Sequence, residues 1–154
     1  MTTVSVEQEI KSLKPFQICQ FRDIYHNEYK LHRYIKIPYN KPDKIILCIF
    51  TSQIKSVEKR YIKFDNKSLN SLVYVTPLEL PFLEKPTIID CHEPNIFTKD
   101  RLIRHIDKDI GFKIKIEENI PDKIKDKLIY AILNSPIVSP ETLFNIPTKI
   151  FTTR

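Results

Sequence analysis

One short stretch constrains the fold of this 154-residue chain more than any other: residues 45–50, Ile-Ile-Leu-Cys-Ile-Phe, are all apolar. A proline and an aspartate lie just before this stretch, and Thr51 and Ser52 follow it. A short apolar run that is rich in β-branched residues and bounded by turn formers is typical of a strand buried on both faces. We therefore predict a central strand over 43–51, with the hydroxyls of Thr51 and Ser52 where the strand leaves the core.

The residues before this stretch alternate with the period of two that a half-buried strand requires. Over 31–38, the odd-numbered side chains, Arg33 among them, point one way, and the even-numbered ones, His32 among them, point the other. The intervening residues 39–43 have the composition of a tight turn. We therefore predict that 31–38 and 43–51 pair as an antiparallel hairpin.

The same reasoning places the remaining elements. A Ser5–Gln8 capping box predicts the start of the first helix, and Thr98 is the predicted N-cap of the second. Pro121 is expected in the first turn of the third helix. The full prediction has helices over 4–14, 98–106 and 121–134, further strands over 16–21, 60–64, 71–76, 87–92 (ending near Pro94) and 112–117, and a proline-rich loop over 77–86.

Short strands that follow one another with few helices between them favour an antiparallel sheet or a small barrel over a parallel α/β sheet. We therefore predict an α+β fold with two or three appended or inserted helices. A chain of 154 residues is most simply one domain. Within 1–154, we predict an N-terminal helix over 1–14, a barrel with helices over 15–136 and an extended C-terminal arm over 137–154.

Composition excludes several classes of site. Gly111 is the only glycine, so the chain lacks the glycine-rich loops that hold nucleotide phosphates, and no cofactor is predicted. The crowded segment Cys91-His92-Glu93 is the best place to look for a metal. In a regular strand, however, His92 would face away from its two neighbours, and the chain has no Cys-x-x-Cys or His-Glu-x-x-His motif. We predict no metal site.

The net charge of +6 favours an acidic partner such as RNA, DNA or an acidic protein, although a solvated lysine surface explains the charge equally well. Three widely spaced cysteines in apolar runs suit reduced thiols in a reducing compartment. The N-terminal residues do not resemble a signal peptide, and no apolar run reaches the ~18–20 residues of a membrane span. A cytoplasmic protein without membrane contacts is therefore expected.

Basic and aromatic residues alternate in two places, around Lys30 to Tyr34 and at Lys59-Arg60. Lysine and arginine bind phosphates, and tyrosine stacks on unpaired bases, so Lys30, Tyr34, Lys59 and Arg60 are candidate nucleic-acid-binding residues. The alternative is that the tyrosines bury their rings at sheet edges while the lysines coat the rim.

The order of segments resembles the PemK/MazF-like toxin superfamily of toxin–antitoxin systems, in particular a divergent branch of it. The similar segments are 32–37, 44–52 and 80–91, followed by the helices over 98–106 and 121–134. The chain lacks the family's glycines before the first strand and its Arg-Pro step, and Leu80 replaces a histidine before Pro-Phe.

This resemblance implies an SH3-like, twisted antiparallel β-barrel and a metal-independent endoribonuclease, often a homodimer and bound by an acidic antitoxin. It implies that Arg33 and Thr51, with Ser52 beside it, are the catalytic residues. Cleavage through the RNA 2′-hydroxyl needs a proton acceptor, for which His32 is a candidate, and a cation that stabilises the phosphorane.

Three hypotheses follow from the sequence. The first is a toxin-like protein that acts on RNA through Arg33, Thr51, Ser52 and His32. The second is a non-catalytic barrel module that binds nucleic acid or an acidic antitoxin-like protein. The third is a structural protein without a polyanionic partner.

Overall fold

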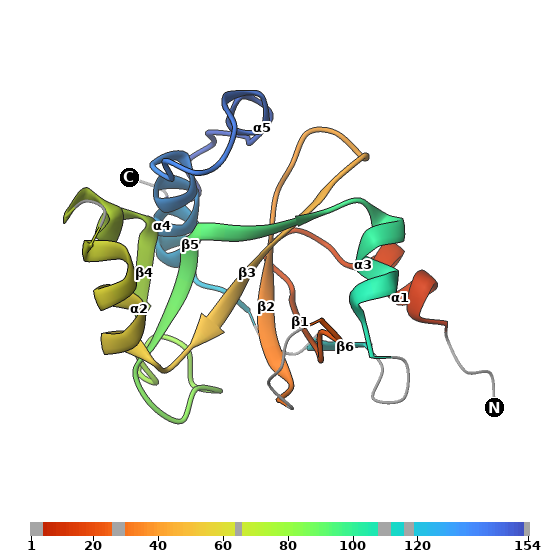
Figure 1. The fold of residues 1–154 in the computed structure, drawn as a ribbon, viewed down its shortest axis with the longest axis horizontal. Helices are drawn as coiled ribbons and strands as arrows, with labels where there is room; N and C mark the ends of the chain where they lie inside the picture. Colours follow the sequence, from red (N-terminus) through yellow and green to blue (C-terminus); the bar gives the residue numbers. More distant parts are fainter. Residues whose placement is uncertain (1–4, 26–29, 64–65, 108–111, 116–118, 153–154) are drawn as a thin grey trace.

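The computed structural model describes residues 5–25, 30–63, 66–107, 112–115 and 119–152 (Figure 1). Its elements, in chain order, are α1 (Val6–Ser12), β1 (Ile18–Phe21), β2 (His32–Ile37), β3 (Ile45–Thr51), α2 (Ile54–Ile62), the 3₁₀ helix η1 (Asn66–Ser71), β4 (Leu72–Val75), β5 (Thr87–Phe97), α3 (Lys99–His105), β6 (Phe112–Lys115), α4 (Asp122–Leu133) and α5 (Pro140–Phe144).

The six strands form one antiparallel sheet in the order β4-β5-β3-β2-β1-β6. The predicted hairpin is confirmed, since β2 pairs with β3 and sets Tyr34 opposite Ile49 and Ile37 opposite Ile46. Strand β3 lies between β5 and β2 and is mostly buried, as predicted for the central strand. The α+β class is therefore confirmed. The predicted closed barrel is not, because the described strands form an open sheet with β4 and β6 at its edges.

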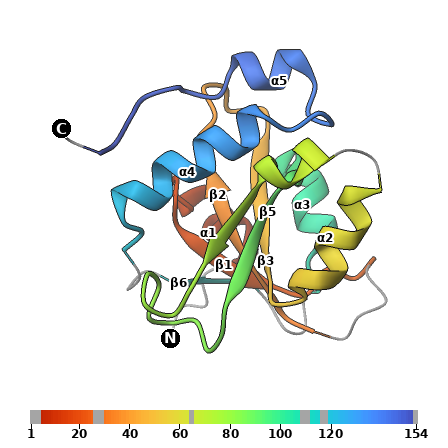
Figure 2. The ribbon, with the colours of Figure 1, turned by 90° about the vertical axis from the view of Figure 1, so that its left-hand side faces the viewer.

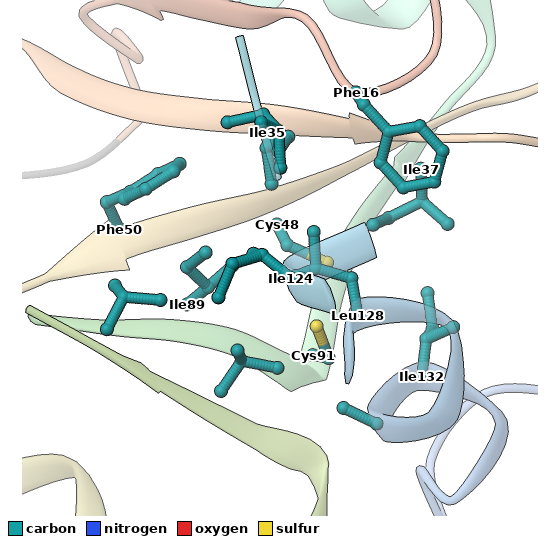
Figure 3. Close-up of a cluster of buried hydrophobic side chains, with 14 of the residues drawn as sticks. Phe16, Ile35, Ile37, Cys48, Phe50, Ile89, Cys91, Ile124, Leu128 and Ile132 are labelled. Carbon is teal, nitrogen blue, oxygen red and sulfur yellow. The ribbon is translucent and has the colours of Figure 1, made fainter. Parts of the chain in front are cut away.

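Helix α4 covers one face of the sheet, which we call the first face. Ile124, Leu128 and Ile132 of α4 pack on Ile35, Cys48, Ile89 and other residues of the strands (Figure 3). The sulfur atoms of Cys48 and Cys91 lie among these side chains, and burial, together with the nearby Cys91, raises the pKa of the Cys48 thiol. Full burial of one such aliphatic side chain contributes about 1.5–3 kcal/mol, so this cluster is a major source of stability.

The opposite, second face carries three helices. Helices α1 and α3 cover one part of it, where Cys19, Tyr34 and Leu47 are buried. Helix α2 covers another part through Val57 and Tyr61, which pack on β4 and β5. Figure 2 shows α2 and α4 on opposite sides of these two strands. Helix α2 and the helices α1 and α3 are thus separated on the second face (Figure 1).

Strand β5 has a large irregularity in the middle of its pairing with β3. Asn95 pairs with Leu47 and Asp90 pairs with Ile49, so residues 91–94 lie opposite Cys48 alone. The predicted end of this strand near Pro94 is wrong, because β5 continues to Phe97. Proline lacks the N–H group that a sheet ladder needs, but a bulge does not require it at this position.

The predicted strand over 60–64 is also wrong, because α2 runs through Ile62; residues 64 and 65 lie outside the described residues. Val57 and Tyr61 are four residues apart and both buried, which is the spacing of one helix face. The local alternation around Tyr61 is typical of a strand, but over the longer segment from Val57 the buried residues have helical spacing.

The C-terminal arm predicted over 137–154 is only partly extended, since α5 interrupts it; residues 153 and 154 lie outside the described residues. The helices predicted over 4–14, 98–106 and 121–134 are present as α1, α3 and α4, and the predicted Ser5 capping box and Thr98 N-cap are confirmed. The prediction that Pro121 lies in the first turn is wrong, because α4 begins at Asp122 and Pro121 is its N-cap. Within the described ranges, no helix has both the length and the apolar character needed to span a membrane.

Candidate functional site

A cleft of about 700 Å³ lies on the second face of the sheet, between α2 and the strands β2, β3 and β5. Its residues come from four separate parts of the chain. They are Lys30, His32, Ile49, Phe50, Thr51, Ser52, Gln53, Ser56, Val57, Arg60, Asp90, Glu93 and Asn95. Three cationic or titratable nitrogen groups, several hydroxyls and amides, and two carboxylates therefore share one depression.

The cleft brings together five of the eight candidate residues predicted from the sequence: Lys30, His32, Thr51, Ser52 and Arg60. His32 is the first residue of β2 and Thr51 is the last residue of β3, so both lie at the same end of this antiparallel pair. The register pairs end at Tyr34–Ile49, two residues before each of them. The first turn of α2 and Arg60 in its last turn complete the wall.

Three predicted residues do not reach this cleft. Lys59 is exposed on α2 but is not among the residues that line it. Arg33 follows His32 in β2 and therefore lies on the first face, where its guanidinium carbon is 5.2 Å from the centroid of the Phe82 ring. The proposed catalytic pair of Arg33 and Thr51 is thus divided between the two faces of the sheet.

Tyr34 is the third predicted residue that does not reach the cleft, and the prediction that it stacks on bases is wrong. Its side chain is 1% exposed, and its ring stacks on Phe21 with 4.4 Å between the centroids. Burial, followed by the nearby Asp23 charge, raises the pKa of Tyr34. Its ring therefore belongs to the core beneath α1 and α3, and it cannot contact a bound polymer.

Asp90 is the most important residue of the cleft that the sequence prediction missed. It is 3% exposed and lies at the start of the irregular part of β5. Its Oδ1 accepts hydrogen bonds from the backbone N–H groups of His92 (3.0 Å) and Glu93 (3.1 Å). The carboxylate therefore stabilises the bulge by satisfying two N–H groups that do not fit the ladder.

The other oxygen of Asp90 faces helix α2. Tyr61 donates its hydroxyl hydrogen to Asp90 Oδ2 at 2.5 Å, and the Arg60 Nη2 atom lies 3.6 Å from the same oxygen. Arg60 Nη2 also donates to the Tyr61 hydroxyl at 3.1 Å. Burial and the hydrogen bond to Asp90 raise the pKa of Tyr61, so the phenol remains a donor. Arg60 is therefore oriented into the cleft by two neighbours.

His92 lies behind this group. Its ring is 4.0 Å from that of Tyr61 in a stacked arrangement, and its side chain is 3% exposed. Neither ring nitrogen has a hydrogen-bond partner among the described residues. Burial lowers the pKa of His92, so the ring is uncharged where it stacks on the ring of Tyr61. His92 supports the cleft without lining it.

The bulge also separates the three residues that were considered as metal ligands. Cys91 packs in the core of the first face, His92 stacks on Tyr61, and Glu93 lines the cleft. The prediction that Cys91 and Glu93 share one face is wrong, because the strand is irregular here. Within the described part of the chain, no group of three or more His, Cys, Asp or Glu side chains could hold a metal ion.

A signal for Asp90 was present in the sequence. It follows Ile88 and Ile89 and precedes Cys91 in a run that is otherwise apolar. A carboxylate in a buried strand requires strong hydrogen-bond donors, so an Asp at this position predicts partners from a distant segment. Those partners, Tyr61 and Arg60, belong to a segment predicted as a strand, so the prediction could not identify them. Comparison with known proteins found no matching family model, curated protein or solved structure.

Proposed function

We propose that this protein acts on RNA, as a PemK/MazF-like toxin-type protein on an SH3-like sheet, and that the cleft beside α2 binds the backbone of a single strand. The observation that carries this proposal is the convergence of Lys30, His32 and Arg60 with the hydroxyls of Thr51 and Ser52 in one cleft. The antiparallel β1–β2–β3 order supports the SH3-like part.

The chemistry of the cleft suits a phosphodiester. Lys30 and Arg60 supply positive charge, and a guanidinium binds two phosphate oxygens at once. The hydroxyls at the end of β3 donate to the same oxygens. Asp90 and Glu93 offset part of this positive charge, since both line the cleft and Asp90 Oδ2 lies 3.6 Å from Arg60 Nη2. The Tyr61 hydroxyl and two backbone N–H groups also donate to Asp90.

Fluorescence anisotropy with a labelled single-stranded RNA tests the binding. We expect the affinity to fall steeply as salt rises, and Lys30→Ala to reduce the slope of log K against log salt by about 0.7, the value for one phosphate contact on a single strand. Lys55→Ala is the matched control, because Lys55 is exposed on α2 outside the cleft.

Two results would contradict this proposal. An affinity for RNA that does not depend on salt concentration would show that the protein does not bind through phosphate contacts. If poly-glutamate competes as effectively as unlabelled RNA, the result would instead favour an acidic antitoxin-like protein as the partner. Such a protein would bind the same cationic side chains.

A second candidate function is metal-independent cleavage of the bound RNA, and the presence of His32 and Thr51 in one cleft favours it. In this reaction the 2′-oxygen attacks the adjacent phosphorus as His32 accepts its proton. The bond from phosphorus to the 5′-oxygen breaks, a 2′,3′-cyclic phosphate forms, and water protonates the 5′-oxygen. The nucleophile is part of the substrate, so no metal-activated water is needed.

Cleavage of a single-stranded RNA in the presence of EDTA tests this function. We expect products with cyclic phosphate ends, and we expect His32→Gln to abolish cleavage while RNA binding remains. A strand of 2′-deoxynucleotides should bind without being cut. Intact RNA after prolonged incubation with the native protein would rule out the nuclease and leave the binding function.

A further inference from the structure

A second hollow, of about 280 Å³, lies at the same ends of β2 and β3 as the cleft, towards the first face of the sheet. His32, Phe50 and Ser52 line both depressions, so the two meet along the strand ends. The hollow is smaller than the ~300 Å³ at which pockets for drug-sized ligands begin. It therefore has room for one planar group and not for a folded segment.

Arg33 and Phe82 determine the character of this hollow. The Arg33 guanidinium lies over the Phe82 ring, and the Phe82 ring contacts that of Phe50 at 6.1 Å between centroids. In the described part of the chain, no carboxylate lies within ion-pair distance of Arg33. A guanidinium whose one face rests on an aromatic ring is restrained in orientation, and its other face is a flat surface on which a base can stack.

The rim of the hollow carries groups that recognise the edge of a base. Gln20 supplies an amide, Glu84 a carboxylate and Lys85 an ammonium group, and all three line the depression. Donors and acceptors at the rim of a stacking surface are the combination by which proteins hold single-stranded bases. The sequence alone did not predict a role for Phe82 or for these three residues.

We propose that this hollow binds one nucleobase of the RNA strand whose backbone lies in the cleft, with the base stacked on the Arg33 guanidinium. The sugar and phosphate then pass over His32 and Ser52 towards Lys30 and Arg60. This inference rests on the proposed function and deepens it. It gives Arg33 a role in recognition, in place of the catalytic role that the family resemblance implies.

The experiment compares two probes of equal length and charge: a single-stranded RNA and an abasic ribose-phosphate strand. We expect the native protein to bind the RNA roughly tenfold more tightly, because stacking on one base contributes about that factor. Arg33→Lys keeps the charge and removes the plane, so it should lose this tenfold preference while its affinity for the abasic strand is unchanged.

Phe82→Leu is the second variant, and it should lower the same preference by releasing the guanidinium. Melting curves show whether each variant folds. The test can be carried out with either variant, provided that its melting curve resembles that of the native protein. The native protein alone also tests the proposal, because equal affinity for the two strands would overturn it without any variant.

The remaining outcomes separate this inference from the proposed function. If the native protein binds both strands with equal, salt-sensitive affinity, the base site is overturned and the proposed phosphate binding in the cleft stands. The same conclusion follows if Arg33→Lys loses equal affinity for both strands. Absence of binding to either strand overturns both. A nucleoside monophosphate that displaces the RNA at the RNA's own concentration would assign the hollow to a free nucleotide and overturn the base site.

Discussion

At the scale of single residues, Asp90 connects the fold to the cleft. One of its oxygens binds the backbone of the β5 bulge, and the other binds the hydroxyl of Tyr61 on α2. A buried carboxylate that loses a donor carries the full cost of desolvation, so each of these contacts matters more than a similar contact at the surface. The stability of the bulge and the position of Arg60 therefore depend on the same side chain.

Tyr61→Phe removes the shortest of these contacts and keeps the ring. We expect the free energy of unfolding to fall by about 1–3 kcal/mol, the cost of leaving a buried acceptor without its donor. Tyr74→Phe is the control, because the Tyr74 hydroxyl donates to Glu58 at 2.6 Å in an exposed position. Its loss should be about 0.5 kcal/mol or less. Equal losses in urea denaturation would contradict this account.

His92 makes stability depend on pH. Burial lowers its pKa below the ordinary value of ~6.5, so the folded protein holds the ring neutral while the unfolded chain takes up a proton. The contribution of His92 is complete above pH ~6.5 and declines as the pH falls towards the lowered pKa of the folded state.

His92→Phe keeps a ring against Tyr61 and cannot titrate. We expect its free energy of unfolding to fall less than that of the native protein between about pH 6.5 and pH 5. Urea denaturation at several pH values within this range measures the difference. Parallel pH profiles for the two proteins would show that His92 does not carry a lowered pKa.

At the scale of elements, helix boundaries follow local chemistry. Ser5, Thr98 and Ser139 each accept a hydrogen bond from a backbone N–H in the first turn of the helix that follows. These helices are short, with 7, 7 and 5 residues. Isolated helices of this length are unstable in water, so their caps and their packing on the sheet must act together.

Thr98→Ala tests this dependence for α3, which covers part of the second face. We expect a loss of about 1 kcal/mol in the free energy of unfolding, the usual cost of removing an N-cap side chain. Thr98→Ser retains the hydroxyl and should restore most of that loss. A serine variant as unstable as the alanine variant would assign the effect to the methyl group and not to the cap.

At the scale of the whole molecule, one side chain fixes the C-terminal segment to α4. Asp126 accepts hydrogen bonds from the N–H groups of Phe151 (2.7 Å) and Thr152 (3.1 Å) and from the Thr152 hydroxyl. The Thr152 hydroxyl and the Phe151 amide lower the pKa of Asp126. The ring of Phe151 then packs against Phe16, 5.2 Å away between centroids.

Asp126→Ala should therefore release this segment without unfolding the sheet. We expect faster amide hydrogen exchange at Phe151 and Thr152 and little change in β3, because local openings of this kind need not involve the core. Lys127→Ala on the same helix is the control, since Lys127 pairs with Glu79 and not with the C-terminal segment. Unchanged exchange at both amides in Asp126→Ala would refute the attachment.

Prediction from the sequence succeeded to different degrees for the fold and for the cleft. Periodicity identified the β2–β3 hairpin and the central position of β3, because these depend on neighbouring residues and on burial. It failed at 60–64, where α2 continues a stripe that begins at Ile54, and at Pro94, where a bulge carries the strand past a proline. For the cleft, the sequence identified Lys30, His32, Thr51, Ser52 and Arg60 but not Asp90 or Glu93.

Local propensity and hydrophobic pattern act over a few residues, so the β2–β3 hairpin and the caps at Ser5 and Thr98 could be read from the sequence alone. The packing of α2 on the sheet brings Arg60, from a helix, into one cleft with His32 and Thr51, from two strands. The tertiary structure also places Arg33 on the other face, above Phe82. The physical reason is that the contacts of Asp90 with Tyr61 and Arg60 join segments 29 and 30 residues apart, and such contacts form only when the sheet and α2 are packed together.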